Sequence, residues 1–114
     1  MKYLVGCDIV YLPVFAQSVQ EGGGESFLEK LFVPSERNMA QSLESLAGYF
    51  AIKESVIKAI GTKVSWLDIV VYKQDSGKPA VRLPLTYTFY QAEVSVAHHG
   101  DYVIAMALLS KETE

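Results

Sequence analysis

Cysteine, charge and long apolar runs are all scarce in this sequence of 114 residues. Cys7 is the single cysteine and has no partner in the chain, which excludes a small secreted domain held together by disulfides. No apolar run approaches the roughly 18–20 residues that span a bilayer. Asp8 interrupts the first apolar stretch and no A-x-A-like cleavage site follows, so we expect no signal peptide. These observations favour a cytoplasmic protein without a membrane partner.

The balance of charged and apolar residues further narrows the class of protein. Hydrophobic residues make up 50% of the chain and charged residues 20%, which is too apolar for a disordered tail. The net charge is −3, whereas nucleic-acid binding needs concentrated positive charge, so we expect no nucleic-acid partner. The length fits one domain over residues 1–114. Such a small domain buries only about 65% of its unfolded surface, and oligomerisation is one way to cover excess apolar surface.

The order of predicted elements indicates an α+β fold. Apolar residues recur at three- and four-residue steps over 43–60, which predicts the longest helix, and Gly61 is a natural stop. The expected class is a single domain with a largely antiparallel sheet and helices packed on one face. Shorter helices are predicted at 14–19, 26–32 and from Pro34, and strands at 3–11, 67–73, 79–85, 93–99 and 102–109.

Two places hold carboxylates that packing does not require. Asp8 lies inside an apolar strand, where a carboxylate is costly unless it faces solvent, a partner or a metal. Glu54 and Lys58 are four residues apart and project from the same face of the long helix. Such a pair can hold a divalent cation beside a phosphate, although spacing alone favours an ordinary surface ion pair.

Two further places are less specific. Gly77-Lys78-Pro79 forms a turn, and such turns are common in strand connections. His98 and His99 are adjacent on a strand and therefore point to opposite faces, which argues against joint zinc binding. A single histidine beside a phosphate or a satisfied surface histidine are the two remaining interpretations of His98. We expect Cys7 to be a small core residue, and Trp66 to lie in the core or at an interface.

The order and spacing of these groups together resemble a known family. The most specific block is the Phe50-Ala51-x-Lys53-Glu54-x-x-x-Lys58-Ala59-x-Gly61 segment. Around it stand Gly6-x-Asp8-Ile9, Phe32-x-x-Ser35-Glu36, Leu46-Ala47-Gly48, Gly77-Lys78-Pro79 and Val94-Ser95-x-x-His98. Over roughly residues 3–109 the chain is similar to the short bacterial 4'-phosphopantetheinyl transferases, the holo-[acyl-carrier-protein] synthases.

The resemblance implies an activity and a metal site. The expected reaction moves 4'-phosphopantetheine from coenzyme A to a serine of an apo acyl carrier protein or a related carrier domain and releases adenosine 3',5'-bisphosphate. Fatty acid biosynthesis is the implied process. Asp8 and Glu54 would hold Mg²⁺ on the coenzyme A pyrophosphate, and Lys58 would contact the phosphate near the scissile bond. Gly61 would help to bind coenzyme A.

The resemblance also implies a homotrimer with sites at the subunit interfaces. Gly77, Lys78 and Pro79 would line the adenine site, and His98 would meet a nucleotide phosphate and take part in catalysis. These groups would come from the neighbour of the subunit that supplies Asp8.

The chain departs from the family pattern at three positions. Val14 and Tyr49 stand where arginines are common, and Ala97 stands where a small hydroxyl residue is usual before the histidine. Residues 85–92 look shorter and more strand-like than the helix expected there. We therefore expect an altered carrier partner. The alternatives are a non-catalytic family member that binds coenzyme A or a carrier without transfer, and an unrelated metal-dependent phosphohydrolase, which suffers from too few carboxylates.

The general base for the attacking serine stays open at this point. Glu36, His98 and a metal-bound water are the candidates.

Overall fold

The computed structural model describes residues 1–113, and its element order places one strand before the helices and four strands after them. The strands are β1 (Lys2–Tyr11), β2 (Val70–Lys73), β3 (Pro79–Arg82), β4 (Gln91–His99) and β5 (Tyr102–Lys111). The α-helices are α1 (Leu12–Glu21), α2 (Glu25–Leu31), α3 (Pro34–Met39) and α4 (Leu43–Ile60), and Trp66–Asp68 and Leu85–Tyr87 form short 3₁₀ helices.

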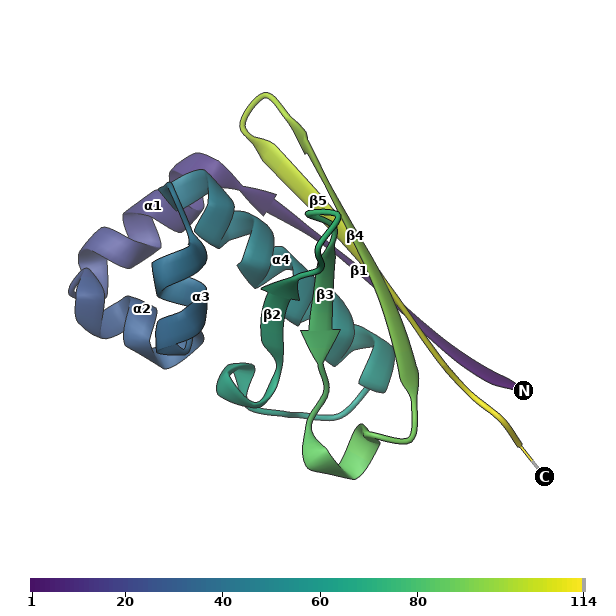
Figure 1. The fold of residues 1–114 in the computed structure, drawn as a ribbon. Helices are drawn as coiled ribbons and strands as arrows, with labels where there is room; N and C mark the ends of the chain where they lie inside the picture. Colours follow the sequence, from purple (N-terminus) through teal and green to yellow (C-terminus); the bar gives the residue numbers. More distant parts are fainter. Residues whose placement is uncertain (114) are drawn as a thin grey trace.

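The strands form two antiparallel sheets. β5 lies between β1 and β4, and β2 pairs separately with β3. In the larger sheet Asp8 stands opposite Ala105, and Ala105 stands opposite Val96. Figure 1 shows the helices gathered on one side of this sheet. The expected α+β class with helices on one face is confirmed, with the strands divided between two sheets.

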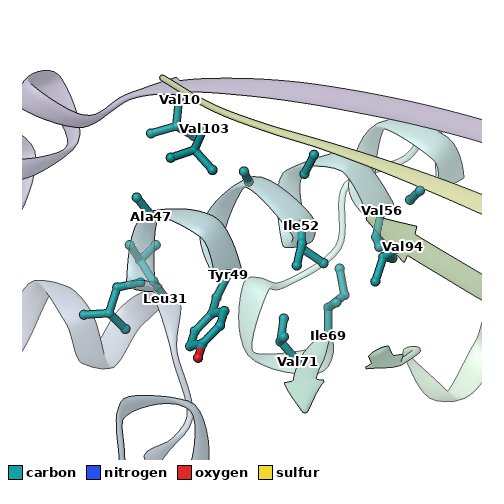
Figure 2. Close-up of a cluster of buried hydrophobic side chains, with 14 of the residues drawn as sticks. Val10, Leu31, Ala47, Tyr49, Ile52, Val56, Ile69, Val71, Val94 and Val103 are labelled. Atoms are coloured by element: carbon teal, nitrogen blue, oxygen red, sulfur yellow. The ribbon is translucent and has the colours of Figure 1, made fainter. Parts of the chain in front are cut away.

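Helix α4 is the centre of the molecule. Its start is capped by the Ser42 hydroxyl, which accepts from the Ser45 backbone N–H, and its end by Gly61 in the left-handed conformation. One side of α4 packs against the three-stranded sheet and another against β2. Figure 2 shows Ile52 and Val56 among buried side chains that come from both sheets.

Gly6 allows β1 to lie directly against α4. A Cβ atom at this position would stand 2.0 Å from the backbone oxygen of Ser55 and 2.6 Å from the backbone nitrogen of Ala59. No residue with a side chain fits this approach without moving the strand. The close contact sets Asp8, two residues further along β1, beside the last turns of α4.

The stretch between α4 and β4 is less regular than predicted. The strand expected at 67–73 begins only at Val70, because Trp66–Asp68 forms a 3₁₀ turn that starts with a hydrogen bond from the Leu67 N–H to the Ser65 hydroxyl. The strand expected at 79–85 ends at Arg82. Residues 85–92 contain a 3₁₀ turn over Leu85–Tyr87, and β4 begins only at Gln91, so the strand-like interpretation is wrong for 85–90.

The face of the larger sheet that turns away from α4 carries exposed apolar side chains. They alternate with the buried positions of β1 and β5, as the pleat of a strand requires. Cys7 lies on this face and is exposed, so the prediction of a core cysteine is wrong for the isolated chain. The apolar members are Tyr3, Val5, Ile9, Tyr11, Tyr102, Ile104, Met106 and Leu108. Among residues 1–113, no helix is both long and apolar enough to cross a membrane.

Candidate active site

Asp8, Glu54 and Lys58 meet where β1 crosses α4. The Lys58 ammonium donates to Asp8 Oδ1 at 2.8 Å, and the Asp8 side chain is only 13% exposed. This hydrogen bond raises the pKa of Lys58 from its ordinary value of 10.5, and the nearby charge of Glu54 adds to the effect. Lys58 is therefore a cation at neutral pH, paired with Asp8 and one helical turn from Glu54.

A cavity of about 340 Å³ opens beside these groups. Asp8 and Glu54 are its acidic lining residues, and the remainder is mostly apolar. The apolar wall comes from β1, α1, α2 and α4, with Ile9, Val10, Tyr11, Val14, Phe15, Phe27, Leu31 and Phe50. The cavity thus presents two anionic groups at the edge of an apolar surface.

A buried ion pair lies behind this site. Glu36 of α3 and Lys53 of α4 are both 0% exposed, and Lys53 Nζ stands 2.6 Å from Glu36 Oε1. Glu36 also accepts from the backbone N–H groups of Val33 at 2.9 Å and Val71 at 2.7 Å. Burial lowers the pKa of Lys53, while the hydrogen bond and charge of Glu36 oppose that shift. Because its carboxylate is closed off from solvent, Glu36 is not the general base, which corrects one of the candidates from the sequence.

Trp66 is a further residue at the site, and sequence reasoning placed it only in the core or at an interface. Its indole Nε1 donates to Glu54 Oε1 at 2.8 Å, and its ring packs against Phe50 with centroids 6.1 Å apart. The side chain is neither core nor free surface, since the residue is 37% exposed. No periodic signal marks this contact, because the two residues lie in different elements.

The other predicted site residues lie elsewhere in the same chain. His98 Nδ1 faces Glu44 Oε1 at 3.2 Å, near the start of α4. Glu44 and Glu54 are ten residues apart, which corresponds to about 15 Å along a helix. Gly61 ends α4 with φ +83°, close in sequence to Lys58. One chain therefore brings Asp8, Glu54 and Lys58 together but leaves His98 at a distance.

The turn Gly77-Lys78-Pro79 joins β2 to β3. Gly77 adopts φ +89°, which favours glycine, and the Lys78 ammonium pairs with Glu93 of β4 at 2.9 Å. Among residues 1–113, no hydrogen bond or ion pair joins this turn to Asp8 or Glu54, so any joint site requires a second copy.

The donor set at Asp8 and Glu54 suits a hard divalent cation. Mg²⁺ is commonly held by one or two carboxylates, with substrate phosphates and water completing its octahedron. Over residues 1–113 there is no group of three or more histidine, cysteine or acidic side chains that could hold a metal. The chemistry thus fits a cation that arrives with a phosphate-bearing ligand better than a closed protein cage.

Comparison with known proteins decides the family. Residues 4–107 match the family model described as the 4'-phosphopantetheinyl transferase superfamily. The chain belongs to this superfamily. A curated relative from Sulfurovum sp. (strain NBC37-1), named holo-[acyl-carrier-protein] synthase, is 32% identical over 95% of this chain and 97% of its own length. A relative of the same name from Bacillus cereus (strain AH187) is 34% identical, with 96% of each chain covered.

Solved structures of superfamily members agree in fold. The Helicobacter pylori holo-[acyl-carrier-protein] synthase in complex with coenzyme A has a TM-score of 0.86 and 29% identity, covering 94% of this chain and all of its own. A complex with coenzyme A described as Chronobacterium ammoniagenes ACPS has a TM-score of 0.84 and 30% identity, covering 99% of this chain. Both solved structures are thus similar to this chain over almost its whole length.

The three departures from the family pattern have different surroundings. Tyr49 is buried in the core, where burial and then the charge of Glu36 raise the pKa of its hydroxyl. It therefore contributes to packing, not to a phosphate-binding surface. Val14 on α1 is 57% exposed, and Ala97 on β4 is exposed. The side chains at these two positions are therefore accessible to a ligand or partner.

Proposed function

We propose that this protein is a holo-[acyl-carrier-protein] synthase that transfers 4'-phosphopantetheine from coenzyme A to a serine of an apo carrier protein. The observation that carries the proposal is that Asp8 and Glu54 line one cavity, with Lys58 bound to Asp8, in a chain of this superfamily. Relatives with coenzyme A bound support the choice of donor.

The chain's own residues supply charge neutralisation and positioning, which are the main needs of phosphoryl-type transfer. The serine oxygen forms a bond to the phosphorus of the phosphopantetheine group while the pyrophosphate bridge breaks and adenosine 3',5'-bisphosphate leaves. Lys58, released from Asp8, contacts the phosphate and neutralises its charge. With Glu36 excluded, His98 of a neighbouring subunit or solvent receives the serine proton.

Asp8 and Glu54 are the residues that would hold Mg²⁺. The cation would supply Lewis-acid neutralisation of the pyrophosphate when bound. Both carboxylates line the same cavity, and neither belongs to the buried Glu36–Lys53 pair. Their role as ligands is thus separable from folding.

The face of the larger sheet that turns away from α4, with its exposed apolar side chains, supports a homotrimer with composite sites. A continuous surface of exposed tyrosine, aliphatic and methionine side chains is typical of an interface. In one chain His98 and the Gly77-Lys78-Pro79 turn lie away from Glu54, so a neighbouring copy would supply them to bind the nucleotide. Gly61, at the end of α4, would contact coenzyme A within the subunit that supplies Lys58.

The carrier partner is proposed to dock at α1. This helix has no acidic residue in its first turn and no basic residue in its last, and Val14 is exposed beside the cavity. Such a surface suits a carrier whose docking helix is apolar and weakly charged better than a strongly acidic one. A cytoplasmic location and a role in fatty acid biosynthesis stay predictions.

Mass spectrometry of apo carrier proteins incubated with coenzyme A and Mg²⁺ tests the proposal. A mass gain of one phosphopantetheine group on a carrier supports transfer. Hydrolysis of coenzyme A without carrier modification contradicts transfer and favours a hydrolase. Binding of coenzyme A or carrier without either change favours the non-catalytic alternative. A matched Lys58→Met variant controls for contaminating transferase.

A further inference from the structure

The 3₁₀ turn that contains Trp66 is held by two consecutive residues of α4. Lys53 Nζ donates to the Trp66 carbonyl oxygen at 2.9 Å. Glu54 Oε1 accepts from the indole Nε1 of the same tryptophan at 2.8 Å. Successive helix residues point about 100° apart, so Lys53 reaches the turn from the interior and Glu54 from the cavity side. The backbone and the side chain of Trp66 are therefore held separately.

Both attachments of Trp66 are to ordered groups. Lys53 is fully buried and makes two further hydrogen bonds, to Glu36 at 2.6 Å and to the Leu31 carbonyl oxygen at 2.7 Å. The indole ring packs on Phe50, one helical turn before Glu54, at an interplanar angle of 48°. The indole N–H is thus a donor at a well-defined place beside the cavity.

An indole N–H has properties that suit the support of a metal-binding carboxylate. It is a donor only and carries no charge, so it binds one carboxylate oxygen without neutralising the carboxylate. Asp8 is in the opposite situation, because its partner is the Lys58 ammonium. Glu54 therefore keeps its full negative charge for a cation, while its orientation is restricted.

We infer that Trp66 is a positioning residue for Glu54: its N–H holds Oε1 and so directs the second oxygen toward the divalent cation. This inference rests on the proposed role of Glu54 as a magnesium ligand. Groups that hydrogen-bond to metal ligands typically change metal affinity or activity by 10–100-fold when they are removed. Loss of the indole N–H is therefore expected to weaken metal binding by about 10-fold.

The direct test uses Mn²⁺ as the probe, with free Mn²⁺ measured by electron paramagnetic resonance at a fixed concentration of coenzyme A. Blanks without protein correct for binding to coenzyme A alone. Trp66→Phe keeps an aromatic ring against Phe50 and removes only the donor. We expect its Mn²⁺ dissociation constant to rise about 10-fold. Leu67→Ala, in the same turn, is the matched control and should bind Mn²⁺ like the parent protein.

Glu54→Gln separates failure of the inference from failure of the proposed function. If Glu54→Gln weakens Mn²⁺ binding and Trp66→Phe does not, the inference is wrong and the metal assignment stands. If Glu54→Gln binds Mn²⁺ normally, both are wrong. If Leu67→Ala weakens binding as much as Trp66→Phe, the effect belongs to the turn as a whole and the inference is overturned. Thermal unfolding of each variant checks that the fold is retained.

A second measurement is the intrinsic fluorescence of the folded protein, since Trp66 is its single tryptophan. Mn²⁺ added with coenzyme A should quench or shift this emission over the same concentrations that the resonance titration reports. The response should be lost in Glu54→Gln. The fluorescence emission could stay unchanged while the resonance titration reaches saturation with Mn²⁺. That result would contradict a direct link between the indole and the metal ligand.

Discussion

Replacing Lys53 with methionine should destabilise the protein strongly while leaving its surface unchanged. The substitution removes three hydrogen bonds, to Glu36, Leu31 and Trp66, and leaves the Glu36 carboxylate buried with only two backbone N–H donors. Breaking a buried pair in this way costs about 3–5 kcal/mol. That is a large part of the roughly 5–15 kcal/mol that stabilises a typical domain.

Urea unfolding followed by circular dichroism measures this loss. With a slope of about 2 kcal/mol per molar urea, the midpoint should fall by roughly 1.5–2.5 M. Lys58→Met, on the same helix, breaks a pair whose lysine is 54% and whose Asp8 carboxylate is 13% exposed. It should cost about 1 kcal/mol and is the matched control. All samples need one protein concentration, because assembly would shift the midpoint. Equal midpoints for the two variants would refute the reasoning.

A second substitution sharpens the same test. Adding Glu36→Gln to Lys53→Met removes the uncompensated charge. The Gln oxygen can replace only one of the two acceptors, because Val33 and Val71 donate to different oxygens of Glu36. The double variant should therefore recover part of the lost midpoint. If it unfolds at still lower urea than Lys53→Met, the buried charge is not the source of the destabilisation.

The remaining predictions concern the site and its partner. Asp8→Ala should lower Mg²⁺-dependent transfer at least 10-fold at limiting Mg²⁺ without lowering the urea midpoint by more than about 0.5 M; full activity at low Mg²⁺ would contradict the metal assignment. Gly6→Ala should lose about 3 kcal/mol or more of stability, since its Cβ would clash with the α4 backbone, and an unchanged midpoint would contradict that packing. Glu54→Ala and His98→Ala, each inactive alone, should regain some activity when mixed and allowed to exchange subunits; no recovery, or light scattering that shows a monomer active on its own, would contradict composite sites. Val14→Arg should raise kcat/KM for a strongly acidic carrier at low salt, whereas a steep loss of parent activity with salt and no gain from the substitution would show that basic residues elsewhere serve the carrier.

Elements with strong local signals were predictable from the sequence. The helix at 43–60 has a clear three- and four-residue period, a serine cap and a terminal glycine, and the structure confirms its bounds. The run at 67–73 is short and apolar, and such a run does not distinguish a strand from a turn. Its first residues belong to a 3₁₀ helix because Ser65 caps it and Lys53 holds the carbonyl oxygen of Trp66. The cap is local, but the lysine comes from another helix.

The candidate site was predictable where residues share one element or one motif. Glu54 and Lys58 share a helix face, and the motif resemblance linked them to Asp8, which already stood out in its apolar strand. The structure brings all three together. The Glu36–Lys53 pair spans seventeen residues and two helices, so no periodicity indicates it. Cys7 and Asp8 alternate along β1, but alternation does not tell which face of a sheet is covered, so the exposure of Cys7 was not predictable.

Because Lys53 and Glu54 are adjacent, the buried ion pair and the site depend more on the rotation of each α4 residue about the helix axis than on which residue types α4 contains. One position faces the interior and the next faces the cavity, so the two charges of opposite sign are sorted by a rotation of about 100°. A single inserted or deleted codon between Gly48 and Lys53 would turn the rest of the helix by that amount. Lys53, Glu36 and Glu54 would all still be present. The Lys53 ammonium, however, would move away from the buried Glu36 carboxylate, and Glu54 would move away from Asp8. In a collection of random variants of this gene, one-residue length changes in α4 should therefore be purged more completely than conservative substitutions at the same positions.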